Sequence, residues 1–476
     1  MGPVTVFDRK RRSRLHGPAV AGLMVALTLG GCAAGPTYVA PSARTLGIPE
    51  QLPSQATAPA GESVSFSRWW TQFDDPILSD LVERALAANT SLAAAKANVA
   101  QARAQLRGTT ANLFPDLTAS TGKTNTAGVA SNSLIGSASW EIDLFGGTRR
   151  SVEASRDSLG GVEAQLNTTR IEITAEVARA YIDARLTQAR LTVAEANLNA
   201  LRESLQVSQW RATAGLVETI DVEQTRQLVA QTEGSLPSLR TNLRSDLNQL
   251  SVLCGTAPGT LDSTVGDSGA IPTFSGTIPD LVPADIVRRR PDVTNAERSL
   301  ASATAQIGVA EARLLPSLSL GGTLTGEGAR FSGLTDHMIS VVTATLTQTL
   351  FDAGRTQAQV EAQRAATNGA LATYRGTVLG ALQDADNAYQ ALRADKESLT
   401  AATTSQTAAR NTATFRQQQY KSGLVDVTAL IDAERTQLSS SDSALQAQAQ
   451  VALQAVTLIQ ALGGDSTAAS DKPSEH

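Results

Sequence analysis

Two long stretches of the chain contain no proline, and this absence limits the possible folds more than any other feature. One stretch separates Pro115 from Pro237 and the other separates Pro316 from Pro473. Proline interrupts a helix because it lacks an N–H and clashes with the preceding turn, so each stretch can form a helix far longer than usual. We expect helices over about 148–214 and 355–422, the first roughly 100 Å long at about 1.5 Å per residue.

Leucines at heptad spacing support these long helices. In the first stretch leucine recurs every seven residues, and small or apolar residues fill the alternate steps, as in a coiled coil. The second stretch is richer in alanine and glutamine. Small side chains let a helix pack closely on two sides, which suits a closed wall of helices better than an isolated two-helix seam. The positions are Leu191, Ala194, Leu198, Leu201 and Leu205 in the first stretch and Leu392 and Leu399 in the second.

The sequence also repeats itself. Residues 89–115 align without a gap with residues 290–316, and AGLVETIDVEQTR (214–226) matches SGLVDVTALIDAER (422–435). Self-similarity in a constant order indicates repeated structural units. We therefore interpret the chain as a tandem duplication in which each half contains a helix ending in Leu/Phe-Pro, a polar alternating stretch, a very long helix, a glycine turn and a return helix.

Two shorter segments are expected to interrupt regular structure. Pro237 falls within the first return helix, so we expect that helix to break and to restart with proline near its first position. The segment GGTLTGEG (321–328) is rich in glycine, but it lacks the lysine and the strand-to-helix setting of a phosphate-binding loop. We expect a turn there.

Residues 1–31 have the layout of a secretory signal peptide. Basic residues from Arg9 to Arg14 precede an almost wholly apolar run that is too short to cross a bilayer. The run ends in LGGC (29–32), which resembles a bacterial lipobox, and we expect Cys32 to carry covalent lipid. Ala33 occupies the position where aspartate signals retention in the inner membrane, so we expect sorting to the outer membrane. An ordinary signal peptide with an incidental cysteine is the alternative.

Composition argues against several functional classes. Without residues 1–31 the chain has 35 Lys and Arg against 44 Asp and Glu, a balance that disfavours nucleic-acid binding. Its remaining histidines are His337 and His476, and its remaining methionine is Met338, too few for a histidine-based triad or a metal cluster. Cys254 then has no partner for an intramolecular disulfide and is expected to be a small buried apolar residue. We expect neither an enzyme nor a cofactor other than the lipid on Cys32.

Two segments alternate in the way expected of membrane-spanning strands. In SLIGSASWEIDLF (133–145) and MISVVTATLTQTL (338–350), apolar residues alternate with mostly polar ones over about ten residues. Residues 117–123 and 317–325 are the expected hairpin partners. Half-buried strands of a small periplasmic sheet are the alternative. Four strands cannot close a barrel, and an open edge is not tolerated in lipid, so a barrel would require several copies of the chain.

These features together resemble the outer-membrane efflux factor family, of TolC/OprM type, and in particular its lipoprotein (NodT-like) branch. The motifs that carry the resemblance are the lipobox, GPTYVAP (35–41), RRRPDVTNAERSLASATAQIGVAEARLLPSLSL (288–320), LFDAGR (350–355) and YKSGLVDVTALIDAERTQL (420–438). The resemblance implies an α+β membrane protein: a homotrimer whose twelve-stranded β-barrel, four strands from each chain, continues into a periplasmic α-helical barrel. It also implies an equatorial belt from residues around 69–77, 239–285 and the C-terminus.

The resemblance further implies a periplasmic gate at the two helix turns. Its residues would be Tyr420, Lys421 and Asp432 in the second half and Asp221 in the first, with Lys421/Asp432-type links between helices. The family position of an apolar constricting residue is Thr428 here, which argues against a second, hydrophobic gate. The turns that contact an adaptor would be Gly215, Leu216 and Val217 and Gly423, Leu424 and Val425.

The expected organisation follows. Residues 1–31 are the signal peptide, 32–66 a lipidated linker, 67–255 and 286–464 the two repeats, 256–285 an equatorial linker and 465–476 a disordered tail. The resemblance implies the passive exit duct of a tripartite pump, lying in the outer membrane and exporting small molecules delivered by an RND-type inner-membrane transporter and a periplasmic adaptor. Type I protein secretion and metal efflux remain alternatives, as does a coiled-coil scaffold lipoprotein without a pore.

Overall fold

The structure is a computed structural model that describes residues 33–42, 68–126, 129–266, 268–276, 290–328 and 338–464. The predicted lipidation site Cys32 and the predicted tail lie outside these residues. The chain divides into two compact units. We call Met1–Ala40, Ala102–Leu159 and Arg298–Leu371 the strand unit, and Pro41–Gln101, Gly160–Glu297 and Ala372–His476 the helical unit.

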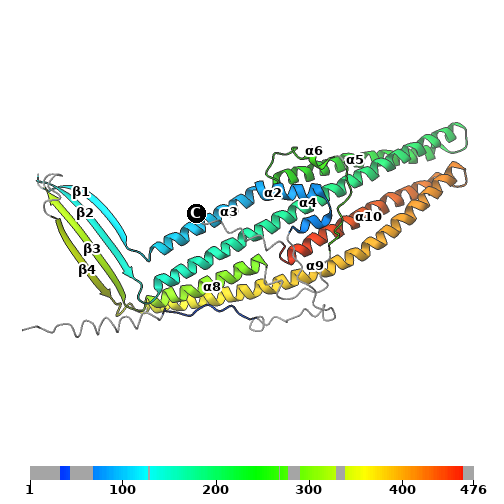
Figure 1. The fold of residues 1–476 in the computed structure, drawn as a ribbon. Coiled ribbons are helices and arrows are strands. Elements are labelled where there is room, and N and C mark those ends of the chain that lie inside the picture. Colours follow the sequence, from blue (N-terminus) through cyan, green and yellow to red (C-terminus); the bar gives the residue numbers. More distant parts are fainter. Residues whose placement is uncertain are drawn as a thin grey trace, which may run out of the picture. The chain divides into compact units, whose positions relative to one another are not determined.

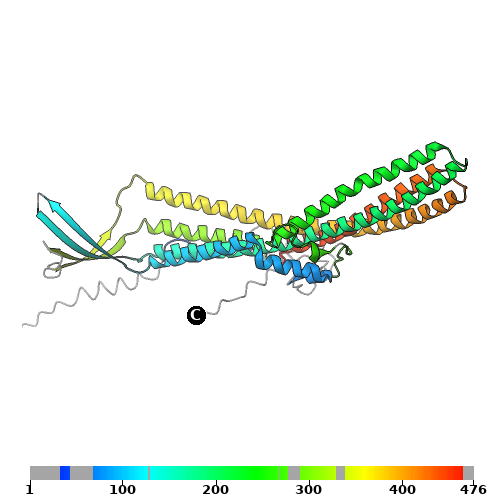
Figure 2. The same ribbon diagram turned by 90° about the horizontal axis from the view of Figure 1, so that it is seen from above.

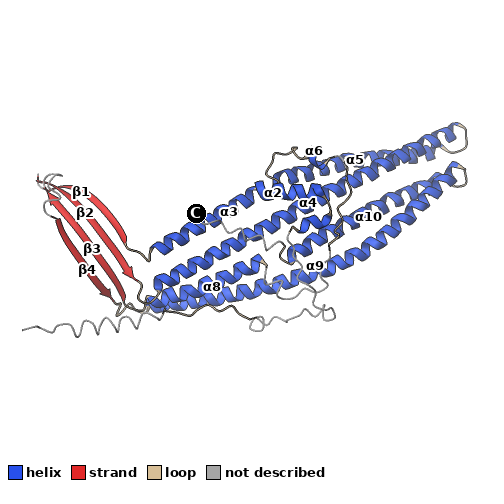
Figure 3. Cartoon of the chain, in the orientation of Figure 1, coloured by secondary structure: helices blue, strands red, loops and turns tan. Residues whose placement is uncertain are grey.

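The strand unit contains a four-stranded antiparallel sheet in the order β1-β2-β3-β4 (Figures 1 and 3). The strands are β1 (Asp116–Thr126), β2 (Val129–Ile142), β3 (Ser317–Gly328) and β4 (Met338–Thr347). The two strands predicted from alternation and their two expected hairpin partners are therefore confirmed. The central contact, β2 with β3, joins the two halves of the sequence. The outer strands β1 and β4 each pair with one neighbour within the described chain.

The strand register gathers most of the apolar residues on one face of the sheet. Directly opposed residues project to the same side, and the pairing sets Trp140 opposite Leu320 and Leu320 opposite Ala344. The next row of the same face joins Ile142, Leu318 and Leu346. Side chains on this face are open to the surroundings, with Leu346 66% and Val342 85% exposed. One face of the sheet is thus an apolar surface that none of the described residues covers.

Two expectations for the strands were wrong. The glycine-rich segment 321–328 is the second part of β3, not a turn. Its glycines fit where strands approach closely, because a Cβ on Gly321 would lie 2.8 Å from the hydroxyl oxygen of Thr343. Strand β4 ends at Thr347 rather than near residue 350. The Gln348 side chain there donates to the Leu314 carbonyl, which replaces continued pairing.

The long helices are confirmed and occur in matched lengths. Helices α4 (Gly147–Thr213) and α9 (Arg355–Lys421) each contain 67 residues, and α5 (Thr219–Leu253) and α10 (Val427–Ala461) each contain 35. Helices α3 (Thr90–Ala111) and α8 (Pro291–Ala312) each contain 22. These equal lengths are what a duplicated sequence predicts. The remaining described helices are η2 (Trp69–Phe73), α2 (Pro76–Ala88) and α6 (Asp262–Val265). Among the described residues, no helix is both long and apolar enough to span a membrane.

Pro237 does not interrupt the first return helix, contrary to expectation. Helix α5 runs through it without a break. Proline removes one backbone hydrogen bond, but here it lies on an exposed position beside the buried Leu236. The buried face continues on both sides, at Leu228 and Leu247. Packing of this face outweighs the missing hydrogen bond, so the helix continues.

The core of the helical unit near the turns is formed by the heptad positions. Leu198 and Leu201 of α4 are buried in a cluster with residues of α5 and α10, and Leu191 and Leu205 pack against its border. The remaining buried members are Ala194, Leu228, Val229, Leu236, Tyr420, Val427, Leu430 and Ile431. The coiled-coil prediction for the first stretch is therefore confirmed in its packing, and the packing joins the two helical hairpins to each other.

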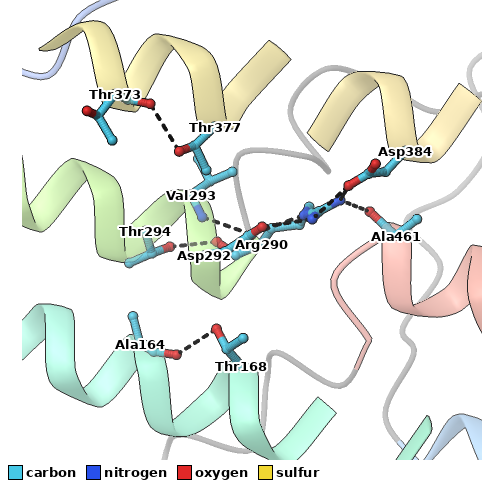
Figure 4. A network of polar contacts seen from close by, with 10 residues as sticks. All are labelled: Ala164, Thr168, Arg290, Asp292, Val293, Thr294, Thr373, Thr377, Asp384 and Ala461. Carbon is cyan, nitrogen blue, oxygen red and sulfur yellow. Dashed lines mark hydrogen bonds and ion pairs between the residues drawn. The ribbon is translucent and has the colours of Figure 1, made fainter. Parts of the chain in front are cut away.

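Arg290 ties the start of α8 to two other helices of the helical unit (Figure 4). Its guanidinium donates to both carboxylate oxygens of Asp292, at 3.0 and 2.7 Å, and to the Ala461 carbonyl at 3.0 Å. Asp384 of α9 lies 3.4 Å from the same guanidinium. The last carbonyls of a helix lack intrahelical partners, so Arg290 caps the end of α10 while it holds α8 and α9.

Candidate functional site: the two helix turns

The two glycine turns of the helical unit share one backbone geometry. Gly215 and Gly423 have φ values of 69° and 74°, in the left-handed region that glycine adopts without strain. In each turn the glycine N–H donates three residues back and the next leucine N–H donates five residues back, at 2.8–3.0 Å. This is the Schellman arrangement, which satisfies the free carbonyls at a helix end. Both helices therefore end sharply, and the return helices begin within a few residues.

The two turns lie next to each other at the same end of the helical unit, in both views (Figures 1 and 2). Leu216 and Leu424 are 69% and 75% exposed at their tips. Val217 and Val425 are half-buried, and Val425 packs against the heptad core. Each predicted contact turn thus combines an exposed leucine with a half-buried valine.

Tyr420 lies between helices α9 and α4. Its side chain is 1% exposed, and its hydroxyl lies 2.8 Å from that of Ser208. The guanidinium carbon of Arg211, on α4, lies 4.8 Å from the centre of the Tyr420 ring, and the same side chain donates to the Tyr420 carbonyl at 2.7 Å. This predicted gate residue is therefore buried inside a single chain, where it joins the last turns of the two long helices.

Lys421 forms an ion pair, but not with the predicted partner. Its Nζ atom lies 3.2 Å from a carboxylate oxygen of Glu203 on α4. Both side chains are about half exposed, at 45% and 60%, and such pairs contribute little stability. Asp432 is exposed on α10, and its carboxylate has no hydrogen bond or ion pair with the described residues of the chain. Within one chain the Lys421–Asp432 link is thus replaced by Lys421–Glu203, because Glu203 lies across the α4–α9 contact.

Acidic residues from both turns come close together. Asp221 lies in the first turn of α5, and Glu218 is the residue before that helix. Asp426 precedes α10 and accepts a hydrogen bond from the Ala429 N–H at 2.9 Å. Burial, followed by repulsion from Glu218 and Asp426, raises the pKa of the Asp221 carboxyl, while Arg211 opposes this shift. No group of three potential ligands in the described chain is arranged to hold a metal ion.

Sequence reasoning identified the turns but missed several residues that organise them: Ser208, Arg211, Glu203, Glu218 and Asp426. Arg211 carried a usable signal, since it is the last basic residue before Gly215, as Lys421 is before Gly423. Asp426 also carried one, because an aspartate immediately before the first apolar residue of a helix, here Val427, is typical of a helix start. Ser208 and Glu203 had no such signal, because only the α4–α9 packing brings them to α9.

A cavity of about 380 Å³ lies between α4, α9 and α10. It is lined mostly by amide, hydroxyl and small apolar side chains. Glu434 of α10 lines it and is 5% exposed. Burial raises the pKa of the Glu434 carboxyl. A buried acid facing a polar cavity is a point where protonation can affect the helix packing.

The chain is similar to known proteins along most of its length. The family model described as outer membrane efflux protein matches residues 81–256 and 282–464. Nodulation protein T of Rhizobium leguminosarum bv. viciae is 30% identical over 448 residues, covering 92% of this chain and 91% of that protein. The antibiotic efflux pump outer membrane protein ArpC of Pseudomonas putida is 28% identical over 463 residues, covering 93% of this chain and 94% of that protein. The solved structure of the outer-membrane channel OprN matches with a TM-score of 0.82 and 32% identity, covering 91% of this chain and 99% of that one.

Proposed function

This chain belongs to the outer membrane efflux protein family, and on that premise we propose that it is the exit duct of a tripartite efflux pump. In this function three copies form a passive channel that releases small molecules outside the cell. An RND-type inner-membrane transporter would supply the energy and a periplasmic adaptor would join the two. The name of its relative ArpC, an antibiotic efflux pump protein, favours small drug-like substrates.

The four-stranded sheet carries this proposal. Its outer strands β1 and β4 each have one paired side within the described chain. Unpaired strand edges are not tolerated in lipid, where each free N–H and C=O costs several kcal/mol. Three copies joined from β1 to β4 would close twelve strands, and bacterial barrels have an even number of strands. The apolar face, with Leu346 and Val342 exposed, then faces lipid and the opposite face lines the duct.

The helix turns are proposed as the gate. Asp432, exposed and without a partner in the described chain, and Asp221 are the groups that remain for contacts between chains or with cations in the duct. Tyr420 and Lys421 act differently, because they hold α9 to α4. Leu216 and Leu424 are proposed as the apolar points on which an adaptor docks. Opening then moves the hairpins apart without unfolding either one.

Covalent lipid on Cys32 is proposed as an additional anchor. Its support is the lipobox-like sequence before it, and several acyl chains on one residue give a durable anchor at about 0.8 kcal/mol per buried CH₂. Acyl mass on the N-terminal peptide of the purified protein tests this directly. An unmodified N-terminus at another residue would contradict it.

Planar-bilayer conductance of the purified protein is the first test of the channel. The proposal predicts discrete, long-lived current steps from a heat-modifiable trimer. A well-folded trimer that gives no steps, including after substitution at the gate, would contradict the channel and favour the scaffold function. Conductance reports the pore itself and is independent of the pump and adaptor.

A further inference from the structure

The N-terminal segment Ala33–Thr37 is bound to the rest of the strand unit by several hydrogen bonds. The Ala34 N–H donates to the Phe145 carbonyl at 2.8 Å. Arg150, in the first turn of α4, donates to the Ala34 carbonyl at 3.1 Å and to the Gly35 carbonyl at 3.2 Å. Its Nη2 atom also lies 3.4 Å from the Thr37 hydroxyl. One side chain therefore contacts three residues of a segment that is more than 110 residues away in sequence.

Arg150 is suited to this contact. It is 7% exposed, and Glu153 on the same helix pairs with its Nη1 atom at 2.8 Å. A buried guanidinium needs its donors satisfied. Here the Glu153 carboxylate takes one of the five donors, and the N-terminal segment takes three, from Nε and Nη2. Without the segment, Arg150 would lose these acceptors. The docking of the segment and the burial of the Arg150 guanidinium therefore depend on each other.

Glycine at two positions permits a close backbone approach. A Cβ on Gly308 of α8 would lie 2.6 Å from the Ala34 carbonyl oxygen and 2.8 Å from Cγ of Arg150. A Cβ on Gly35 would lie 2.4 Å from the Gly308 Cα atom, and Gly35 has a φ of 84°. No larger residue fits at either position without movement of the backbone. The segment is thus seated in a shape-specific contact as well as a polar one.

The bound segment begins where the strands meet the helices. A Cβ on Gly146, which lies between β2 and α4, would be 3.0 Å from the Cβ of Ala33. Cys32 precedes Ala33 in the sequence, and consecutive Cα atoms are about 3.8 Å apart. The described segment therefore begins beside Gly146, four residues after the end of β2, and the residue that we expect to carry lipid comes one position earlier in the sequence.

We propose that Arg150 and Gly308 form a clip that holds the N-terminal segment so that lipid on Cys32 enters the membrane beside the end of strand β2. The proposal rests on the lipid anchor of the proposed function. Without the clip, lipid would tether the chain without fixing the depth or orientation of the sheet. With it, anchor and apolar sheet face are presented to the membrane together. Arg150 is a positioning residue, and insertion of the sheet depends on it in addition to lipidation.

Disulfide formation between Ala33→Cys and Gly146→Cys measures the clip in the full-length, membrane-inserted protein. The Cβ separation of 3.0 Å is shorter than the roughly 3.5–4.5 Å of disulfides, so the backbone must shift slightly, and this strain is common to all variants compared. In this background we expect Arg150→Gln and Gly308→Ala each to slow cross-linking about tenfold. Two matched controls should leave the rate unchanged. Arg156→Gln changes an exposed arginine of the same helix, and Gly108→Ala adds a Cβ where no atom lies within 4 Å.

A second experiment measures membrane insertion as the fraction of trimer that resists extraction from the membrane. Slower cross-linking and reduced insertion in both clip variants, with partial recovery in Arg150→Lys, is the expected result. Equal cross-linking rates in the clip and control variants, or no cross-link in the parent, would overturn the clip. Acyl mass on Cys32 is read separately. Absence of lipid would refute the anchor of the proposed function, whereas the cross-link would still show whether Arg150 and Gly308 hold the segment.

Discussion

The hydroxyl of Tyr420 lies 2.8 Å from the hydroxyl of Ser208, and both side chains are buried, at 1% and 0% exposure. This hydrogen bond joins the last turns of α9 and α4, just before the two glycine turns. The helix ends at the proposed gate are therefore held together inside each chain, and contacts that change during opening must lie elsewhere. Asp432 and Asp221 are the predicted residues that remain available for that purpose.

Replacing Tyr420 by phenylalanine should destabilise the protein, because the Ser208 hydroxyl loses its buried partner. We expect a loss of about 1–3 kcal/mol in the free energy of unfolding, measured by denaturant or thermal unfolding in detergent. Adding Ser208→Ala should restore much of this loss, since no unsatisfied group then remains. Ser422→Ala, at an exposed position, is the control. Additive losses in the double variant would contradict the proposed pairing.

Asp432→Ala should increase the frequency or size of current steps in planar bilayers, because it removes a carboxylate proposed to hold neighbouring chains at the gate. Lys421→Ala should have a smaller effect, since its partner is Glu203 of the same chain. An exposed pair of this kind contributes about 0–1 kcal/mol. Steps that are identical in the parent and Asp432→Ala would leave the channel in place but locate the gate elsewhere.

Glu434→Gln should change how stability depends on pH. Burial raises the pKa of Glu434, so the folded protein binds this proton more tightly than the unfolded chain does. Its stabilising contribution is complete below the ordinary pKa of about 4.3, and it is lost as pH rises through the raised value. At pH 7 the glutamine variant should thus have a free energy of unfolding about 1 kcal/mol higher than the parent. This difference should vanish near pH 4, as followed by thermal or denaturant unfolding at several pH values. Glu397→Gln, at an exposed position, should show no such pH-dependent difference in stability.

Arg290→Gln should weaken the helical unit. The change removes the cap on the Ala461 carbonyl and leaves Asp292 and Asp384 without their shared partner. We expect a loss of about 2–4 kcal/mol, seen as a lower unfolding midpoint. Arg393→Gln is a suitable control, because its side chain is 72% exposed and pairs within one helix. Equal losses in the two variants would argue against a special role for Arg290.

Leu216→Ser together with Leu424→Ser should reduce efflux while leaving the isolated channel intact. Both leucines are largely exposed, so their replacement costs the folded chain little. The expected result is unchanged conductance with greater drug sensitivity of cells that depend on this pump. Val425→Ser differs, because Val425 packs against the heptad core and its loss should lower stability as well. Normal efflux in the double leucine variant would exclude these tips as docking points.

Much of the fold followed from periodic patterns in the sequence. The absence of proline and the heptad leucines predicted α4 and α9 to within a residue or two. Alternation predicted β2 and β4, and β1 and β3 were expected as their hairpin partners. The errors arose where one local signal competed with packing. Pro237 and the glycines of 321–328 usually interrupt regular structure, yet a continuous buried face and close strand pairing decided otherwise.

Only those parts of the site that are contiguous in the sequence could be predicted. Glycine, leucine and valine at the two turns could be identified because each motif is contiguous. The partners of Tyr420 and Lys421, by contrast, lie more than 200 residues away, and nothing in the local sequence specifies which α4 residues face α9. A glutamate such as Glu434 is usually exposed, and nothing in its local sequence indicates burial. It is buried because α4, α9 and α10 meet around it.

The outer edges of the β1–β4 sheet have no partner within the described chain, and this has a consequence when intact and defective copies are made in the same cell. If each channel needs three copies to cover those edges, an equal mixture of intact and defective chains leaves about one assembly in eight wholly intact. A defective copy that still pairs through β1 and β4 would therefore suppress the normal one. Loss-of-function alleles that preserve the sheet should be dominant, whereas alleles that destroy it should be recessive.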